Sequence, residues 1–198
     1  MAVRGERPRL TSIRLRGIIL AVTLACLLHV TTAGFPATVA YGTTGISIPC
    51  GVAIDPNSDA IYIVDYGNHR VLRFDNRNTL NPSSVPTMAF GQSSLAGIST
   101  NDGGSVSATG FHYPYAACVD GSGTLYVSDN FNHRVIFFHN AASITTMPHS
   151  ADGVLGQSSF SASTSNQGVS PSANGMMYPN GCSVMGSSLW LADNGNHR

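Results

Sequence analysis

The residues most able to do chemistry in this chain are an Asn-His-Arg tripeptide that occurs three times and the aspartate that precedes each copy. The tripeptide stands at residues 68–70, 132–134 and 196–198, so successive copies are 64 residues apart. Histidine is the commonest metal ligand in proteins, and an arginine can donate two parallel hydrogen bonds to a carboxylate. The chemistry available is therefore metal binding by the histidines or ion pairing between aspartate and arginine.

Ion pairing is the interpretation we favour, because the histidines recur with the whole turn and no second ligand stands beside any of them. Each arginine would bind its aspartate at two points and tie neighbouring strands or blades together. The asparagine is expected in the left-handed conformation, which it tolerates, with Gly67 and Gly195 supporting a tight turn. The structural repeat motif then consists of Asp65, Asn68, His69, Arg70, Asp129, Asn132, His133, Arg134, Asp193, Asn196, His197 and Arg198.

No other pattern points to catalysis. The chain has no Gly-x-Ser-x-Gly and no His-Glu-x-x-His sequence, and its only glutamate is Glu6. Asp55, Asp59 and Asp120 are expected in solvated turns, and the pair Gly103-Gly104 is too weak a signal for phosphate binding. We therefore expect no catalytic, cofactor-binding or metal-binding residue, and no cofactor.

The cysteines follow the repeat rather than a metal-site pattern. Cys50, Cys118 and Cys182 are 68 and 64 residues apart, and Cys26 lies in an apolar N-terminal run. Small residues packed on buried strands are the expectation. An exported protein could join two of these three cysteines in a disulfide, but the sequence does not select the pair.

The elements that position the turns are predicted by the repeat. A second marker, Gly-Gln-Ser-Ser, stands at 91–94 and 156–159, and two markers in one register indicate copies of one supersecondary unit. Short runs rich in β-formers predict strands at 51–55, 61–64, 71–74 and 87–90, then at 116–120, 125–128, 135–138 and 153–155, then at 189–192. Tyr62, Tyr126 and Trp190 share one repeat position and are expected to pack within each unit. The polar stretches 93–110 and 158–175 are expected to be long loops, either functional or solvated and poorly ordered.

The repeat resembles a known family. The pattern Pro-x-Gly-Val-Ala-x-Asp, then Leu/Ile-Tyr-Val/Ile-x-Asp, then Asn-His-Arg-Val-x-x-Phe is similar to the NHL repeat, in the longer form with Gly-Gln insertions that secreted or bacterial proteins carry, over about residues 46–198. The resemblance implies an all-β fold, a β-propeller of four-stranded antiparallel blades. Strands three and four of the third unit are absent, so we expect about two and a half blades and interpret the chain as a C-terminally truncated propeller.

The N-terminus predicts export. Five arginines precede the apolar run 17–30, whose 14 residues are short for a membrane span of about 20 residues. We expect a signal peptide over 1–33 and a linker over 34–45, with cleavage after Ala33 or, as a second candidate, after Ala40. An uncleaved signal anchor is the alternative. The propeller blades then occupy 46–198, as blade 1 (46–92), blade 2 (114–157) and a partial blade 3 (179–198), with inter-blade loops at 93–113 and 158–178.

The net charge of the chain limits the classes of partner that we expect. Beyond residue 16 the chain has five arginines, nine aspartates and no lysine, a net charge of −4, which argues against a nucleic-acid partner. We expect a non-enzymatic, secreted scaffold that binds an unknown protein or small ligand through its loops. Two alternatives stay open: a metal-dependent lyase- or lactonase-like propeller enzyme, as some relatives of the resembled family are, and a membrane-anchored sensor or adhesive ectodomain if the N-terminal segment is uncleaved.

Overall fold

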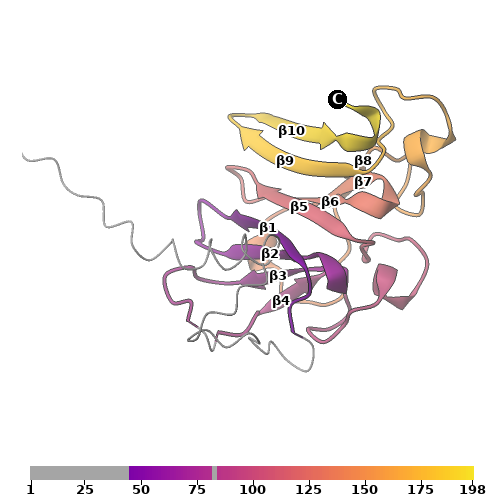
Figure 1. Ribbon diagram of the computed structural model, residues 1–198. Helices are drawn as coiled ribbons and strands as arrows, with labels where there is room; N and C mark the ends of the chain where they lie inside the picture. The colour runs from indigo at the N-terminus through magenta and orange to yellow at the C-terminus, as the bar shows by residue number, and fades with distance from the viewer. Residues whose placement is uncertain (1–44, 82–83) are drawn as a thin grey trace, which may run out of the picture.

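Antiparallel sheets make up nearly all of the regular structure. The computed structural model describes residues 45–81 and 84–198, which form sheets of four, four and two strands joined by loops and short 3-10 turns (Figure 1). The strands are β1 (Pro49–Ile54), β2 (Ile61–Asp65), β3 (Arg70–Phe74) and β4 (Met88–Phe90); β5 (Pro114–Val119), β6 (Leu125–Asp129), β7 (Arg134–Phe138) and β8 (Gly153–Leu155); and β9 (Pro179–Met185) and β10 (Ser188–Asp193). The predicted all-β fold of four-stranded antiparallel units is confirmed.

Each sheet is a meander in which strands that follow one another in the chain are paired. The register repeats from unit to unit, since Asp65 lies opposite Arg70 in the first sheet and Asp129 opposite Arg134 in the second. The first strands β1, β5 and β9 contact one another in turn and lie side by side in Figure 1. The sheets are thus arranged as neighbouring blades of a partial propeller, with the first strand of each blade on the inside.

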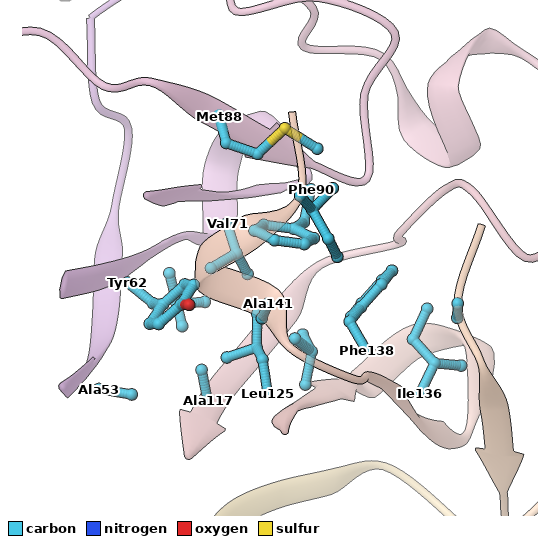
Figure 2. Packing of buried hydrophobic residues seen from close by; sticks show 14 of the residues in the cluster. Ala53, Tyr62, Val71, Met88, Phe90, Ala117, Leu125, Ile136, Phe138 and Ala141 are labelled. Carbon is cyan, nitrogen blue, oxygen red and sulfur yellow. The ribbon is translucent and has the colours of Figure 1, made fainter. Parts of the chain in front are cut away.

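A shared apolar core joins blade 1 to blade 2. Tyr62, Val71 and Phe90 from blade 1 pack with Leu125 and Phe138 from blade 2 in one buried cluster (Figure 2). A loop of blade 2 completes the contact, because Ala141 is buried in the same cluster and its carbonyl accepts a 2.8 Å hydrogen bond from Arg73 of blade 1. Burial of this kind stabilises a fold by about 25 cal/mol for each Å² of apolar surface removed from water.

The tyrosine position differs between the units. Tyr62 is fully buried and packs on Phe90, whereas Tyr126 is half-buried beside Phe137. The expected packing is wrong for Trp190, whose exposed fraction is 61%. The difference follows from the neighbouring elements. Tyr62 packs in one cluster with residues of blade 2, including Ala141. Among the described residues, β10, which carries Trp190, pairs only with β9.

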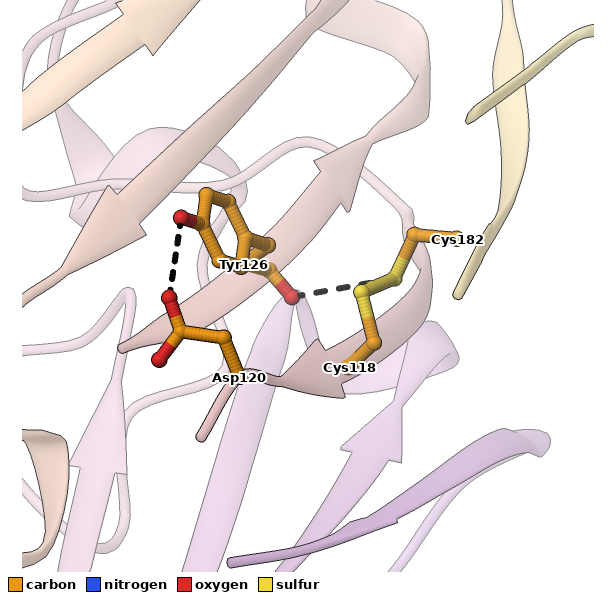
Figure 3. The surroundings of a disulfide bond; sticks show 4 residues. All are labelled: Cys118, Asp120, Tyr126 and Cys182. Atoms are coloured by element: carbon orange, nitrogen blue, oxygen red, sulfur yellow. Dashed lines mark hydrogen bonds between the residues drawn. A yellow bond between two sulfur atoms is a disulfide. The ribbon is translucent and has the colours of Figure 1, made fainter. Parts of the chain in front are cut away.

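A disulfide joins the innermost strands of blades 2 and 3. It links Cys118 of β5 to Cys182 of β9, close to Tyr126 and Asp120 (Figure 3). The pair that the sequence left open is therefore the one separated by 64 residues. Cys50, on β1, donates its thiol hydrogen to the carbonyl of Tyr115 at 3.0 Å.

The predicted signal peptide (1–33) lies outside the described residues, as does nearly all of the predicted linker (34–45). Within the described ranges no helix has the length and apolar character needed to cross a bilayer.

Candidate functional site

The candidate site lies on the end of the blades that carries the Asn-His-Arg turns. Strands alternate in direction, so the turns after β2, β6 and β10 and the long loops that enter β5 and β9 are on the same end of the sheets. We call this end the turn face and the opposite end, with the β1–β2 and β5–β6 turns, the hairpin face.

One polar network repeats in all three turns. In the second, Asp129 Oδ2 accepts hydrogen bonds from Arg134 Nε at 2.7 Å and Asn132 Nδ2 at 2.8 Å, while its Oδ1 accepts one from the backbone N–H of His112 at 2.7 Å. Asp65 and Asp193 accept the corresponding bonds from their own arginine, asparagine and preceding loop. The side chains of Asp129 and Arg134 are completely buried, so the pair is held away from water with its hydrogen-bonding groups satisfied.

The predicted pairing of aspartate and arginine is present, but the predicted two-point fork is wrong for Arg134. Its Nε alone meets Asp129, and its two terminal nitrogens donate to carbonyls of Phe160 at 2.6 Å and of Ser107 and Gly110, both at 2.9 Å. Phe160 lies in the loop after blade 2 and the other two lie in the loop before it. The guanidinium therefore fixes two long loops, a task that uses four of its five N–H donors.

The left-handed residue of the turn is the histidine and not the asparagine. His69, His133 and His197 have φ of 54°, 54° and 55°, while each asparagine closes a three-residue 3-10 turn. The asparagine must stay inside the turn because its amide bonds the aspartate three residues earlier. Gly67 and Gly195 are also not required by the turn itself, since Phe131 occupies the same place in the second unit.

The histidine rings have a positioning role. Nδ1 of His69 accepts the backbone N–H of Tyr113 at 3.1 Å, and Nδ1 of His133 accepts that of Tyr178 at 3.2 Å. Burial lowers the pKa of His69 below its ordinary value, and nearby His112 lowers it further. Burial also lowers the pKa of His133, against an opposing effect of Asp129. Both rings thus favour the neutral form, which the acceptor role requires.

The two long loops are folded against the blades, which explains the Gly-Gln marker. Gln92 Nε2 donates to the carbonyls of His69 at 3.0 Å and Ser99 at 2.8 Å, and Gln157 repeats both contacts in the next unit. The glycine before each glutamine has a positive φ, 88° at Gly91 and 85° at Gly156. The sequence marked these residues as a repeat without revealing that they anchor the loops.

Aromatic side chains form a continuous row across the turn face, which sequence reasoning missed. Tyr66 packs on Tyr113 with ring centroids 4.7 Å apart, Tyr113 on Phe131 at 5.1 Å, and Phe131 on Tyr178 at 5.4 Å. We call these four residues the aromatic row. The exposed fraction of Phe131 is 42%, and that of nearby Tyr115 is 41%. The available signal was the apolar residue before each strand-one proline, at 48, 113 and 178.

The backbone presents this row in an uncommon conformation. Ile48, Tyr113 and Tyr178 occupy equivalent positions in the three units and all have φ near 50°, at 50°, 51° and 51°. A positive φ is costly for a bulky residue and persists only where the surroundings determine it. Here the histidine acceptor below each tyrosine supplies that constraint.

The hairpin face carries a pocket of about 340 Å³ between blades 2 and 3, lined by residues that include Asp120, Ser122, Tyr126 and Leu189. Burial would raise the pKa of Asp120, but hydrogen bonds from Ser122 and Thr124 hold it below its ordinary value. Asp120 Oδ1 accepts hydrogen bonds from Ser122 and from the backbone N–H of Thr124. Asp120 Oδ2 accepts a hydrogen bond from the Tyr126 hydroxyl at 3.2 Å (Figure 3). At the corresponding place between blades 1 and 2, Asn57 Nδ2 donates a hydrogen bond to the carbonyl of Gly121.

Two expectations about acidic and metal-binding residues can be compared with this geometry. Asp55 is buried rather than solvated, because it accepts the N–H groups of Asn57 and Ser58 in its own turn. Over 45–81 and 84–198, no three His, Cys, Asp or Glu side chains are grouped so that they could hold a metal ion.

The comparisons with known proteins agree with the fold. The model of the NHL repeat family matches residues 47–74, which comprise β1, β2, the first Asn-His-Arg turn and β3. No curated protein matches the chain. The first Asp-x-x-Asn-His-Arg turn, described above from its contacts, therefore lies within the matched NHL repeat.

Proposed function

We propose that this NHL-repeat chain is an exported, non-enzymatic propeller that binds a protein or another ligand through its turn face. An NHL repeat in antiparallel blades indicates a β-propeller, a fold commonly used for protein binding. Because one fold can serve many functions, the proposal depends on the site and not on the family alone.

The observation that carries the proposal is the aromatic row. Tyrosine and phenylalanine are enriched at protein interfaces, and contiguous exposed apolar residues mark interaction sites. In this chain two of the four residues, Tyr113 and Tyr178, are held by a strained backbone and a histidine acceptor, so their rings are ordered before any ligand arrives. A preorganised aromatic surface loses little conformational entropy on binding.

Site-specific photocrosslinking tests binding by the turn face. A benzophenone amino acid replaces Phe131 in the full chain, and in the matched control it replaces Met185, which is 64% exposed on the hairpin side. We expect crosslinking from residue 131 to a defined partner, and binding of that purified partner to be weakened at least about tenfold by Phe131→Ser. Equal crosslinking from both positions, or none from residue 131, would contradict the proposal.

Export rests on the arginine-rich start and the apolar run at 17–30. N-terminal sequencing of the protein recovered from the culture medium should give Gly34 as its first residue. Retention of the intact N-terminus in the membrane fraction would replace this proposal with that of an anchored ectodomain.

Metal analysis tests the proposal that the chain is not a metal-dependent enzyme. We expect metal analysis of the purified full chain to find a divalent metal well below one ion for each protein. A stoichiometric metal ion would favour the metal-dependent enzyme instead.

A further inference from the structure

We propose that the pocket on the hairpin face binds the ammonium group of a small, free alkylamine, with Asp120 as its counter-ion. The pocket lies between blades 2 and 3, at the end of the blades opposite the turn face. Binding here goes beyond the proposed function and is independent of it, because it uses a different surface and a small molecule.

The pocket is open because the turn of blade 2 does not reach blade 3. Between blades 1 and 2, Asn57 Nδ2 extends across the gap to the carbonyl of Gly121 at 3.0 Å. The corresponding turn of blade 2 is one residue shorter, and its Ser122 hydroxyl bonds back to Asp120 at 2.7 Å. This leaves a volume of about 340 Å³, which is at the lower end of the range for small-molecule sites.

A covalent link holds the two sides of the pocket together. Cys118 and Cys182 form the disulfide, and each precedes a lining residue, Asp120 or Val184, by two positions. Figure 3 shows the disulfide beside Asp120 and Tyr126, which also lines the pocket. Because the strands are tied so close to its walls, the pocket is formed before a ligand arrives.

Asp120 gives the pocket a negative charge that no other described residue neutralises. The arginines within 45–81 and 84–198 all pair with other aspartates, and the pocket lining contains no arginine or histidine. Burial would raise the pKa of Asp120, but hydrogen bonds from Ser122 and Thr124 hold it below its ordinary value. The carboxylate is therefore ionised at neutral pH, so it repels anionic ligands and attracts cationic ones.

The open acceptor position favours an ammonium over a guanidinium. Asp120 Oδ1 already accepts three hydrogen bonds, from the N–H and hydroxyl of Ser122 and from the N–H of Thr124. Oδ2 accepts one, from the Tyr126 hydroxyl, so this oxygen has room for a donor from a ligand. A guanidinium binds best to both oxygens of a carboxylate, whereas an ammonium needs one.

The other lining residues suit the rest of a short primary amine. The hydroxyls of Ser187 and Ser188 are not bonded to any described residue, so their oxygens can accept the remaining N–H groups. Val184 and Leu189 are half-buried and give an apolar wall for a short alkyl chain. Residues 1–198 contain no lysine, so a second copy of this chain has no such side chain to insert.

Titration of the purified full chain with n-butylamine, followed by the amide NMR signals of Gly121 and Gly186, tests this site. We expect both signals to shift saturably with n-butylammonium, less with n-butylguanidinium and not with 1-butanol. Asp120→Asn should weaken n-butylammonium binding at least about fivefold, because it removes the charge and keeps an acceptor for the turn. Asp152→Asn is the matched control, since Asp152 also accepts a backbone N–H but lies outside the pocket lining. It should change the affinity by less than about twofold.

Ser188→Lys gives a second measurement that does not alter the Asp120 turn. Ser188 is exposed at the start of β10, so the fold should be kept while the new ammonium reaches Asp120 and abolishes n-butylammonium binding. Circular dichroism of each variant checks that the blades remain folded.

The inference would be overturned by the absence of a saturable shift with n-butylammonium, by equal effects of Asp120→Asn and Asp152→Asn, or by unchanged binding in Ser188→Lys. Equal binding of 1-butanol or glucose would show that the charge does not select the ligand. Tighter binding of Nα-acetyl-lysine N-methylamide than of n-butylammonium would assign the pocket to a lysine of a protein instead. Crosslinking through residue 131 is unaffected by these results, so the failure of one proposal is distinguishable from that of the other.

Discussion

His69, His133 and His197 share a left-handed backbone conformation. The left-handed residue lets the chain leave a 3-10 turn and enter the third strand, as at the end of a helix. For His69 and His133 the ring then accepts the N–H of a tyrosine in the following loop. At this scale the histidine is a structural acceptor, which accounts for its recurrence without a metal ion.

The acceptor role makes stability depend on pH. The pKa values of His69 and His133 are lowered in the folded state, and so is that of His112, mainly by burial. As pH falls below about 6.5, the unfolded chain takes up protons that the folded chain resists, so the free energy of unfolding decreases. Above about pH 7.5 this contribution is fully present.

Urea unfolding followed by circular dichroism between pH 5.5 and 7.5 measures this dependence. We expect the unfolding free energy to rise with pH, with a smaller slope for His133→Asn, because asparagine tolerates the left-handed conformation and does not titrate. A flat profile for the unmodified chain would refute the acceptor role.

The loss of unfolding free energy on replacing an arginine of the turn depends on how deeply that arginine is buried. Arg134→Gln should lower the unfolding free energy by about 3–5 kcal/mol, because it leaves Asp129 buried without its cation. Arg198→Gln is the matched control in the third unit, where the arginine is 43% exposed, and should cost about 1 kcal/mol or less. Similar losses measured by urea unfolding for both variants would show that burial does not decide the effect.

At the scale of the elements, the strands were predictable and the loops were not. The predicted runs of β-formers match β2, β3, β4, β6, β7, β8 and β10 within one residue at each end. Strands β1 and β5 begin two residues before their predicted starts, at their prolines, and β9 was not predicted. The loops at 93–113 and 158–178 are ordered by arginine contacts to main-chain carbonyls, which leave no side-chain pattern to read. The aromatic row was hidden for a similar reason, because its members come from separate turns and loops.

The glycine of the Gly-Gln marker is required by both conformation and space. Gly91→Ala should lower the unfolding free energy by about 1–3 kcal/mol, since φ there is 88° and a Cβ would collide with the Phe111 ring. Gly121→Ala is the control, because nothing lies within 4 Å of its added Cβ, and should change stability by less than about 0.5 kcal/mol. Thermal unfolding of the two variants separates them. Equal melting temperatures would contradict this explanation.

At the scale of the whole molecule, blades are joined by side-chain packing and by one covalent link rather than by a continuous sheet. The core in Figure 2 joins blades 1 and 2, and the disulfide in Figure 3 joins the inner strands of blades 2 and 3. The repeat spacing could suggest that cysteines meet between blades, but choosing the pair required the positions of β5 and β9.

Removing the disulfide tests this link. Cys118→Ser combined with Cys182→Ser should lower the unfolding free energy by about 2–4 kcal/mol, because the bond closes a loop of 64 residues in the unfolded chain. Cys50→Ser is the control and should cost about 1 kcal/mol or less, since a serine hydroxyl keeps a donor near the Tyr115 carbonyl. Urea unfolding with and without a reducing agent gives the comparison. An unchanged midpoint on reduction would show that the link contributes no stability.

The choice of main-chain oxygens as the arginines' partners has an evolutionary consequence. Arg134 holds the carbonyls of Ser107, Gly110 and Phe160, and none of these contacts depends on the side chain that the carbonyl's residue carries. Substitution at a position such as Ser107 can alter the chemistry of the surface while the path of the loop is preserved, whereas Gly110 has no room for a Cβ beside the Asn101 backbone. Descendants of one blade could therefore diverge in what they recognise without having to invent a new architecture.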